Sequence, residues 1–237
     1  MATRNSDDRD EPDAIHRTDG VDEVDEHWGA RWPYHSAAGA LCLEFANTLG
    51  YRSVVPSQEE DLRDYADLLT WAERMGVLSA ARVTALRAWA GTHARDADAV
   101  FTRAIALREL LYGVFAAVAA SDAPASDDLA HLNAAYRNAM VHAEVLATTE
   151  GFAWGWDDAL DAPDAMLWPV ARGAAELLVA PERARLRHCA APDCSWLFLD
   201  TTKNGSRHWC SMRGCGNRAK ARRFRARQHG EAGAADI

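Results

Sequence analysis

The 237-residue sequence has no uninterrupted apolar run near the roughly 18 residues that a membrane helix requires, so we expect no membrane partner. Its first residues are polar and rich in aspartate. They lack the apolar segment of a secretory signal peptide, which predicts a cytoplasmic protein. Lysine is almost missing: of the 26 basic residues, only Lys203 and Lys220 are lysines. Arginine therefore supplies nearly all of the positive charge.

The sequence also lacks the local motifs of common enzymes. It has no glycine-rich phosphate-binding loop, no Ser/His/Asp arrangement of recognisable spacing and no nearby carboxylate pair for acid–base chemistry. We therefore expect no catalytic residues and a protein that is not an enzyme. An active site assembled from distant residues stays open at this point.

The charge is divided unevenly along the chain. Residues 183–229 contain twelve basic and two acidic residues, a formal charge of +10, whereas the rest carries 14 basic and 33 acidic residues, or −19. The total of −9 hides this division. Such asymmetry indicates that the two parts face different partners, and that the basic part suits a polyanion.

The two ends of the chain are predicted to be without stable structure. Residues 1–27 are almost wholly polar and acidic, so they cannot bury enough apolar area to offset their conformational entropy. We expect a disordered acidic arm, which either stays solvated or folds back on the basic segment and competes with nucleic acid. Residues 230–237 are expected to form a flexible tail.

Residues 28–180 are predicted to form a mainly helical domain. Ser57 and Glu60 resemble a capping box ahead of a helix through Met75, after which Gly76 occupies a C′ position. Short alternating segments at 141–147 and 152–156 predict a hairpin. Further helices are expected at 79–89 with Ser79 as the cap, 96–120, 126–139 with Ser126 or Asp127 as the cap, and 164–179, where Pro169 suits the first turn.

The large apolar residues of this domain are predicted to be core. Cys42 lies between two leucines, which is typical of a small buried hydrophobe. The tryptophan-rich segment 152–168 could instead line a pocket for a small-molecule effector. The tryptophans for which packing is expected are Trp71, Trp89, Trp154, Trp156 and Trp168.

Four of the five cysteines lie close together near the C-terminus. Cys189 and Cys194 form one pair and Cys210 and Cys215 a second, each with four residues between its members and with 15 residues between the pairs. In a cytoplasmic chain this clustering favours a metal over disulfides. Zinc prefers four such ligands in a tetrahedron. We therefore predict one structural zinc ion, which leaves no open coordination position for catalysis.

Other interpretations of the cluster stay open. The thiols could form disulfides, act in redox chemistry or hold an iron–sulfur cluster. His188 and His208 adjoin the cysteines and could replace one of them as a ligand. Four thiolates with one zinc ion carry a formal charge of about −2, so some nearby arginines are expected to neutralise the metal. These are Arg187, Arg207, Arg213 and Arg218.

The segment between the two cysteine pairs predicts a hairpin. Residues 196–200 resemble a strand and 207–210 its return, joined by Asn204-Gly205, a strong turn signal. A cysteine loop, a hairpin and a second cysteine loop that enters a helix resemble a treble clef, a small zinc finger of ββα type.

A strongly basic helix is predicted after Cys215. Phe224 is its one large apolar residue, so little of the helix can be buried. Phosphates would remove the repulsion between its charges, although a solubilising tail is the alternative. The residues expected to contact nucleic acid are Arg218, Lys220, Arg222, Arg223, Arg225 and Arg227.

These motifs resemble a known pair of families. Cys215-Gly216-Asn217-Arg218, preceded by residues 194–200 and 207–211, is similar to the signature of CGNR zinc fingers, and residues 39–50 are similar to the opening motif of the ABATE domain. The resemblance covers residues 30–229. It implies a bacterial transcriptional regulator, stress-responsive, whose zinc module contacts DNA.

The expected fold is thus mainly α (α+β), with a helical domain over 28–180 and a zinc finger over 185–229. The expected function is zinc-dependent DNA binding. RNA binding through Phe224 and Trp209, or ligand sensing with a purely structural finger, are the alternatives. Recognition of a palindrome would need a homodimer, and any dimer would have to use the helical domain, because the sequence contains no coiled-coil heptads.

Overall fold

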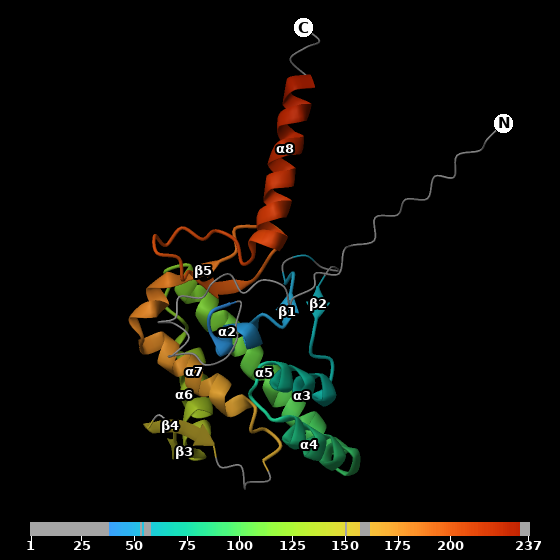
Figure 1. The fold of residues 1–237 in the computed structure, drawn as a ribbon, viewed down its shortest axis with the longest axis vertical. Coiled ribbons are helices and arrows are strands. Elements are labelled where there is room, and N and C mark those ends of the chain that lie inside the picture. Colours follow the sequence, from blue (N-terminus) through green and yellow to red (C-terminus); the bar gives the residue numbers. More distant parts are fainter. Residues whose placement is uncertain (1–37, 53, 55–57, 150, 157–161, 233–237) are drawn as a thin grey trace, which may run out of the picture.

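The computed structural model describes residues 38–52, 54, 58–149, 151–156 and 162–232 (Figure 1). Over these residues the molecule is mainly helical and includes small antiparallel sheets of two strands each, which confirms the predicted mainly α (α+β) class. The acidic arm 1–27, the predicted cap Ser57 and residues 233–237 of the expected tail lie outside the described part. No described helix has the length and apolarity needed to cross a membrane.

The elements follow one another without an internal repeat. The helices are α2 (Leu41–Ala46), α3 (Tyr65–Arg74), α4 (Ala80–Thr92), α5 (Ala94–Ala119), α6 (Ser126–Met140), α7 (Leu167–Val179), η1 (Pro181–Arg185), η2 (Met212–Gly216) and α8 (Asn217–Ala232). The strands are β1 (Leu49–Gly50), β2 (Glu59–Glu60), β3 (Ala143–Thr148), β4 (Gly151–Trp156), β5 (Leu186–His188) and β6 (Leu197–Leu199).

Two of the predicted helix caps are wrong. Helix α3 begins at Tyr65, and Asp64 caps it by accepting a hydrogen bond from the Asp67 backbone N–H at 2.8 Å. The predicted partner Glu60 lies in β2 instead, where it forms an ion pair with Arg108. Ser126 is the first residue of α6 rather than its cap, and no side chain caps that helix.

Other helix signals are confirmed. Ser79 caps α4 through a hydrogen bond from the Arg82 N–H at 3.2 Å. Gly76 follows α3 with a φ of +69°, the left-handed conformation that glycine adopts without strain. Pro169 lies in the first turn of α7, where its missing N–H costs no hydrogen bond. The predicted hairpin forms as β3 and β4.

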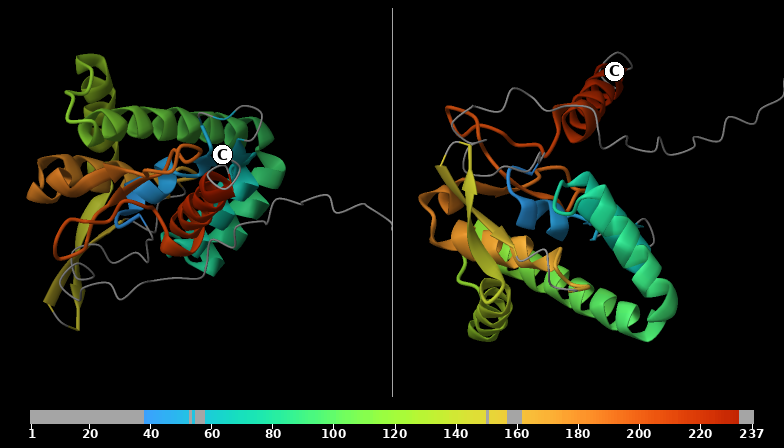
Figure 2. Two further views of the ribbon diagram at one scale, coloured as in Figure 1. Left: turned by 90° about the horizontal axis from the view of Figure 1, so that it is seen from above. Right: turned by 60° about the horizontal axis from the view of Figure 1, so that its bottom comes forward.

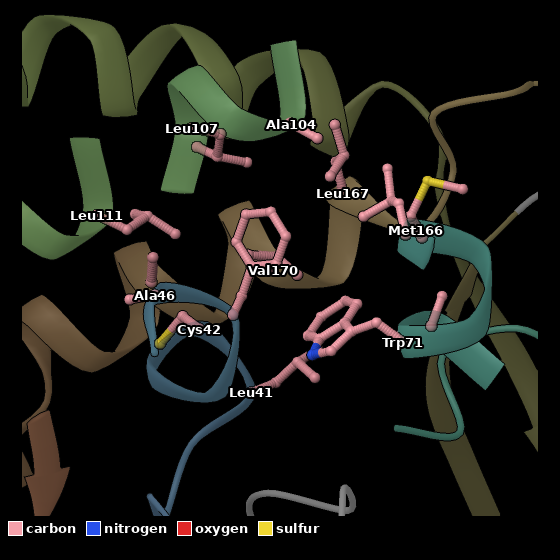
Figure 3. Packing of buried hydrophobic residues seen from close by; sticks show 14 of the residues in the cluster. Leu41, Cys42, Ala46, Trp71, Ala104, Leu107, Leu111, Met166, Leu167 and Val170 are labelled. Atoms are coloured by element: carbon pink, nitrogen blue, oxygen red, sulfur yellow. The ribbon is translucent and has the colours of Figure 1, made fainter. Parts of the chain in front are cut away.

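Short helix α2, which the sequence did not predict, lies at the centre of the core. Figure 3 shows Leu41, Cys42 and Ala46 of α2 among residues of α5 and α7. Five of its six residues are buried, so the segment has no amphipathic periodicity from which a helix could be recognised. Cys42 is fully buried as predicted, and burial raises the pKa of its thiol to about 12.

The five tryptophans differ in their surroundings. Trp71 and Trp168 are buried, and Trp89 and Trp156 are half-buried, so these four pack against the protein as predicted. Trp154 does not: 54% of it is exposed on β4. The prediction for Trp154 is wrong because the β3–β4 hairpin extends past the helices that cover its base.

Strand β6 joins the C-terminal segment to the helical core. One edge of β6 pairs with β5, and the other contacts α2 and the residues before it. The Asn47 side chain accepts a hydrogen bond from the Leu197 N–H at 3.0 Å and donates one to the Leu197 carbonyl at 2.8 Å. The Leu199 N–H donates to the Ala38 carbonyl at 2.8 Å. Leu197 and Leu199 are fully buried in the same apolar cluster as α2.

The predicted pairing of 196–200 with 207–210 is therefore wrong. The hairpin consists of β5 and β6, and residues 201–210 form no strand. Both edges of β6 are already bonded, so a returning segment has no free edge to pair with. Asn204-Gly205 does form a turn, in which Gly205 has a φ of +61°.

Candidate metal centre and basic helix

Three short segments bring the four cysteines together. Cys189 follows β5, and the chain then turns so that Cys194 donates its N–H to the Ala191 carbonyl at 3.0 Å. Cys210 ends the loop after β6, and Cys215 lies in the π-helical turn η2 that leads into α8. The metal-site residues thus come from one loop before β6 and one helix entrance after it, an arrangement that resembles a treble clef.

The sulfur atoms have the spacing of a tetrahedral metal site. All four Sγ atoms lie within 4.8 Å of one another, with 3.7 Å between Cys194 and Cys210 and 3.6 Å between Cys210 and Cys215. A zinc ion with Zn–S bonds of ~2.3 Å separates its sulfurs by about 3.8 Å. The cysteines therefore fit the predicted ion, and distances well above an S–S bond exclude a disulfide between these pairs.

The electrostatics of the cluster favour a cation. The pKa of Cys189 is lowered because its sulfur accepts hydrogen bonds from Cys194 and then from Cys210 and Cys215. The pKa of Cys210 is raised, mainly by its hydrogen bond with Cys189. The pKa of Cys215 is lowered as well, so two thiolates form readily, but further thiolates at this distance repel them. A divalent ion removes that repulsion, which is why metal binding and proton release are linked.

Gly216 lies close to two side chains at the helix entrance. A Cβ atom added to Gly216 would lie 2.8 Å from the Met212 sulfur and 3.3 Å from the Trp209 ring. The turn is capped at Ser211, whose hydroxyl accepts a hydrogen bond from the Gly214 N–H at 3.3 Å. A larger residue at 216 would have to displace the end of the Met212 side chain, which is 45% exposed.

The loop between the cysteine pairs is ordered around Asp200 and Arg207. The fully buried Asp200 carboxylate accepts hydrogen bonds from the Arg207 N–H at 2.9 Å and from the Thr202 N–H at 2.9 Å. Burial opposes ionisation of Asp200, but these hydrogen bonds outweigh it and lower its pKa. The Arg207 guanidinium lies 4.5 Å from the Phe198 ring centre and donates to the Cys210 carbonyl. Arg207 therefore fixes the backbone that presents a ligand.

Arg218 lies against the cluster rather than in the solvent. It donates to the Cys215 sulfur at 3.1 Å, and its Nε is 3.8 Å from the Asp193 carboxylate. Burial opposes its charge, but the Cys215 thiolate outweighs that effect, and the pKa of Arg218 is raised. The Arg222 guanidinium also lies 3.7 Å from the Asp193 carboxylate. Asp193, between the first two cysteines, thus fixes the lower part of α8.

The helical core braces the first cysteine loop from the other side. Ser195, which is buried, accepts a hydrogen bond from the Arg52 N–H at 3.0 Å. Its carbonyl accepts from the Tyr112 hydroxyl of α5 at 3.0 Å. The Arg52 guanidinium stacks 3.9 Å from the centre of the Tyr112 ring. The position of the metal site is therefore coupled to α5.

Helix α8 extends from this site into the solvent. Figure 1 shows α8 projecting from one end of the molecule, with β3 and β4 at the opposite end, and Figure 2 shows it from above. A helix of 16 residues is about 24 Å long. Among its basic residues Lys220, Arg223, Arg225 and Arg227 are exposed, and Phe224 is 62% exposed.

The structure separates the six predicted nucleic-acid contacts into two groups. Arg218 and Arg222 face Asp193, so their charges are partly neutralised within the protein. Lys220, Arg223 and Arg227 follow an i, i+3, i+7 spacing, which places them on the opposite side of the helix. Arg225 shares the side of Arg222 but lies one turn farther from Asp193.

The neighbouring histidines and arginines lie outside the cluster of ligand atoms. His188 is exposed, and its Nε2 is 3.2 Å from the Tyr112 hydroxyl. His208 is exposed too, and its carbonyl accepts from the Ala190 N–H. Arg187 donates to the Ala184 and Leu186 carbonyls. Arg213 is exposed.

Several supporting residues escaped the sequence interpretation. These residues are Asp193, Asp200, Tyr112 and Asn47. They contact residues that lie between 2 and 150 positions away in the sequence. A signal existed for Asp193 and Asp200, since they are the two acids within the basic segment. No pattern marked Asn47, because its partners are backbone atoms of a strand far along the chain.

Comparison with known proteins supports the resemblance drawn from the motifs. The sequence profile of the CGNR zinc finger matches residues 185–228. That of ABATE, a family described as "Putative stress-induced transcription regulator", matches residues 39–181, more than half of the chain. The two families occur in the predicted order. A search of curated proteins gave no match to this chain.

Proposed function

The chain belongs to the ABATE family and ends in a CGNR zinc finger, and from this premise we propose that it is a zinc-dependent DNA-binding transcriptional regulator of bacteria. The observation that supports this most is α8, which projects from a four-cysteine site with four exposed basic residues (Figure 1). A charged helix of this kind gains most from a partner that carries many phosphates. On this proposal the protein acts in the cytoplasm, at the nucleoid, and is not an enzyme.

One structural zinc ion is proposed at Cys189, Cys194, Cys210 and Cys215. Bound there, it would crosslink the loop before β6 to the entrance of α8, and four thiolates would leave it no position for substrate. Arg218 and Asp193 then set the direction of α8 relative to the cluster. The metal-site residues thereby hold the helix rigid at its base while its distal part stays accessible.

The accessible side of α8 is the proposed DNA contact. Lys220, Arg223 and Arg227 lie on the side away from Asp193, and Arg225 lies beyond its reach. The major groove of DNA, about 12 Å wide, admits a single helix, and arginine can bind phosphates or guanine edges in a bidentate manner. Arg218 and Arg222 belong to the metal site on this proposal, and contribute less to DNA affinity than their charge alone would indicate.

Salt dependence of binding to random duplex DNA tests this proposal. Metal-loaded protein is titrated against labelled duplex by fluorescence anisotropy at several salt concentrations. Four phosphate contacts give a slope of log K against log salt of about −3.6. In the Lys220→Ala/Arg223→Ala/Arg227→Ala variant, the magnitude of this slope should decrease by about 2.7.

The matched control is Arg74→Ala/Arg95→Ala/Arg137→Ala, which removes three equally exposed charges from α3, α5 and α6. It should leave the slope unchanged, because those residues lie on the helical core. No binding even near ~50 mM salt, where phosphate contacts are strong, would disprove the proposal. Equal losses in the two triple variants would show that α8 is not the contact.

RNA is the second candidate partner, and exposed Phe224 is the observation that favours it. An aromatic ring among basic residues can stack on an unpaired base. Competition of labelled duplex DNA with single-stranded RNA of equal length distinguishes the two. Stronger competition by RNA, abolished by Phe224→Ala, would replace DNA by RNA as the proposed partner.

A small-molecule effector is proposed for an open cavity of about 810 Å³ beside the finger. Its wall is mainly apolar and includes Val118, Leu129 and Leu178, while Arg183 and Arg187 add positive charge. Arg187 lies on β5, two residues before Cys189. Ser121, in the wall, has a φ of +66° because it lies just after the end of α5, and its N–H donates to the Val118 carbonyl at 3.0 Å.

An amphipathic carboxylate fits this wall, and decanoate is a simple probe. It should raise the thermal unfolding temperature of the wild type and change its DNA affinity, with both effects reduced in Arg183→Gln. Absence of a thermal shift in the wild type would remove the effector from the proposal without affecting the DNA contact.

A further inference from the structure

The β3–β4 hairpin exposes more large apolar side chains than any other described part of the molecule. Val145 is 63% exposed, Phe152 82% and Trp154 54%. In the register of the hairpin, Val145 is opposite Trp154 and Ala147 is opposite Phe152, so these residues share one face. We name this face, made by Val145, Ala147, Phe152 and Trp154, the hairpin face.

At its base, the hairpin face is continuous with buried apolar residues of the protein. At the base of the hairpin, Trp156 packs against buried Trp168 of α7, with ring centres 5.9 Å apart. Farther out, the Arg172 guanidinium lies 4.9 Å from the Trp154 ring centre and is itself held by Glu176 at 2.7 Å. Trp154 therefore has a fixed orientation, although half of it is uncovered by the described residues.

The opposite face of the hairpin is partly covered by its own side chains. A Cβ atom at Gly155 would lie only 2.1 Å from Leu146 Cδ1, which shows that Leu146 lies directly over this glycine, although 44% of Leu146 is exposed. Most of the exposed apolar area of the two strands therefore lies on the hairpin face. A two-stranded sheet by itself is marginally stable in water, so a cover on the hairpin face would add the missing support.

We propose that the hairpin face packs against the same face of a second copy of this chain, which makes the protein a homodimer. The exposed parts of Phe152 and Trp154 alone amount to about 300 Å², from the area that a buried aromatic residue covers. A stable interface buries about 800 Å² per partner. The two aromatics and their neighbours therefore supply a large part of what a dimer needs.

Charge restricts the faces through which two copies can meet. The chain carries −9 in total, so two copies repel each other, and a contact between them needs a face that is free of charge. Across Ala143–Thr148 and Gly151–Trp156, Glu144 is the one charged residue, and it points to the face opposite Val145. The two strands therefore bring no charge to the hairpin face, and Arg172, which lies over the Trp154 ring, is paired with Glu176. A two-fold axis makes such a contact self-complementary.

This inference does not depend on the proposed DNA contact. The hairpin and α8 lie at opposite ends of the molecule in Figure 1, and the dimer is measured without nucleic acid. A dimer of this kind keeps both basic helices accessible, since neither contributes to the interface.

Sedimentation equilibrium of the full-length, metal-loaded chain tests the proposal. The wild type should have twice the 26.0 kDa mass of one chain, with a mass that falls on dilution. Phe152→Ser should raise the dimer dissociation constant at least about 30-fold, the effect of losing a central aromatic contact. Val145→Glu, which places two like charges across the axis, should have a similar effect.

Phe224→Ser is the matched control, because it removes an equally large exposed ring from α8 and should leave the dissociation constant unchanged. Circular dichroism should be the same in all variants, since Phe152 is 82% exposed and supports little of the fold. A wild type that stays monomeric up to about 100 µM, a weak affinity for any assembly, overturns the proposal. A dimer that both hairpin variants leave intact overturns it too.

Discussion

The helical core and the zinc finger of this chain are stabilised in different ways. The core is built on apolar contacts around α2, with five of its six residues buried, and its surface is strongly acidic. The finger has a small apolar cluster around Phe198 and the cysteines, and it is strongly basic. Its strands β5 and β6 are supported by the core, in which Leu186, Leu197 and Leu199 are buried, and the proposed zinc ion would hold the part around the cysteines. With this support the finger can carry surplus charge on α8.

Loss of the metal should have the largest effect on the finger. Cys210→Ser, or treatment of the wild type with a strong chelator, should unfold the finger and remove DNA binding, because metal binding of this kind contributes about 10–16 kcal/mol to folding. Atomic absorption measures the zinc content and circular dichroism the helix content, and both should fall. Cys42→Ser is the control: it alters a buried thiol in the core and should leave one zinc ion per chain. Full zinc content in Cys210→Ser would contradict the proposed ligand set.

Asn47 tests whether core and finger fold as one unit. Asn47→Ala leaves the N–H and the carbonyl of Leu197 without their side-chain partner in a buried position, which should cost about 2–4 kcal/mol. If the two parts are coupled, one unfolding transition should shift to lower denaturant concentration, whether followed by circular dichroism or by zinc release. Two separate transitions in the wild type would show that the parts unfold independently.

Asp200 should give the finger a dependence on acid pH. Its pKa in the folded protein is lowered, so its stabilising effect is complete above the ordinary carboxyl pKa of about 3.9 and is lost as the pH falls through the folded value. Asp200→Asn should cost about 1–3 kcal/mol at pH 7. The difference in unfolding temperature between the variant and the wild type should shrink as the pH is lowered to 3. A difference that stays constant with pH would assign the effect to packing.

Asp193 should have the smallest effect on stability and a measurable one on binding. Its ion pairs with Arg218 and Arg222 are 3.8 and 3.7 Å long and partly exposed, so Asp193→Ala should cost less than about 1 kcal/mol. It also releases two positive charges near the proposed DNA contact and removes a negative one. The affinity for duplex DNA at low salt, measured by fluorescence anisotropy, should therefore increase. A decrease would mean that the orientation of α8 matters more than its free charge.

The parts of the molecule differed in how well the sequence predicted them. The long helices, the β3–β4 hairpin and the clustering of the cysteines follow from local periodicity and spacing, and these were predicted. Helix α2 and the β5–β6 pairing were not, because they depend on contacts across the whole chain. Asn47 and Leu197, for example, are 150 residues apart. On α8, the sequence predicted that Arg218 would help to neutralise the metal. It did not predict the ion pairs of Arg218 and Arg222 with Asp193, because only the folded loop brings Asp193 to them.

The position of β6 also bears on how the protein is made. Strand β6 closes a core whose central helix, α2, leaves the ribosome about 150 residues earlier. Residues 41–46 are almost wholly apolar, and α5 and α7, which cover most of them, are synthesised before the finger. Their contact with β6 has to form last, after a delay of roughly eight to thirty seconds at a translation rate of 5–20 residues per second. The core of the helical domain is therefore completed only when the finger has been synthesised.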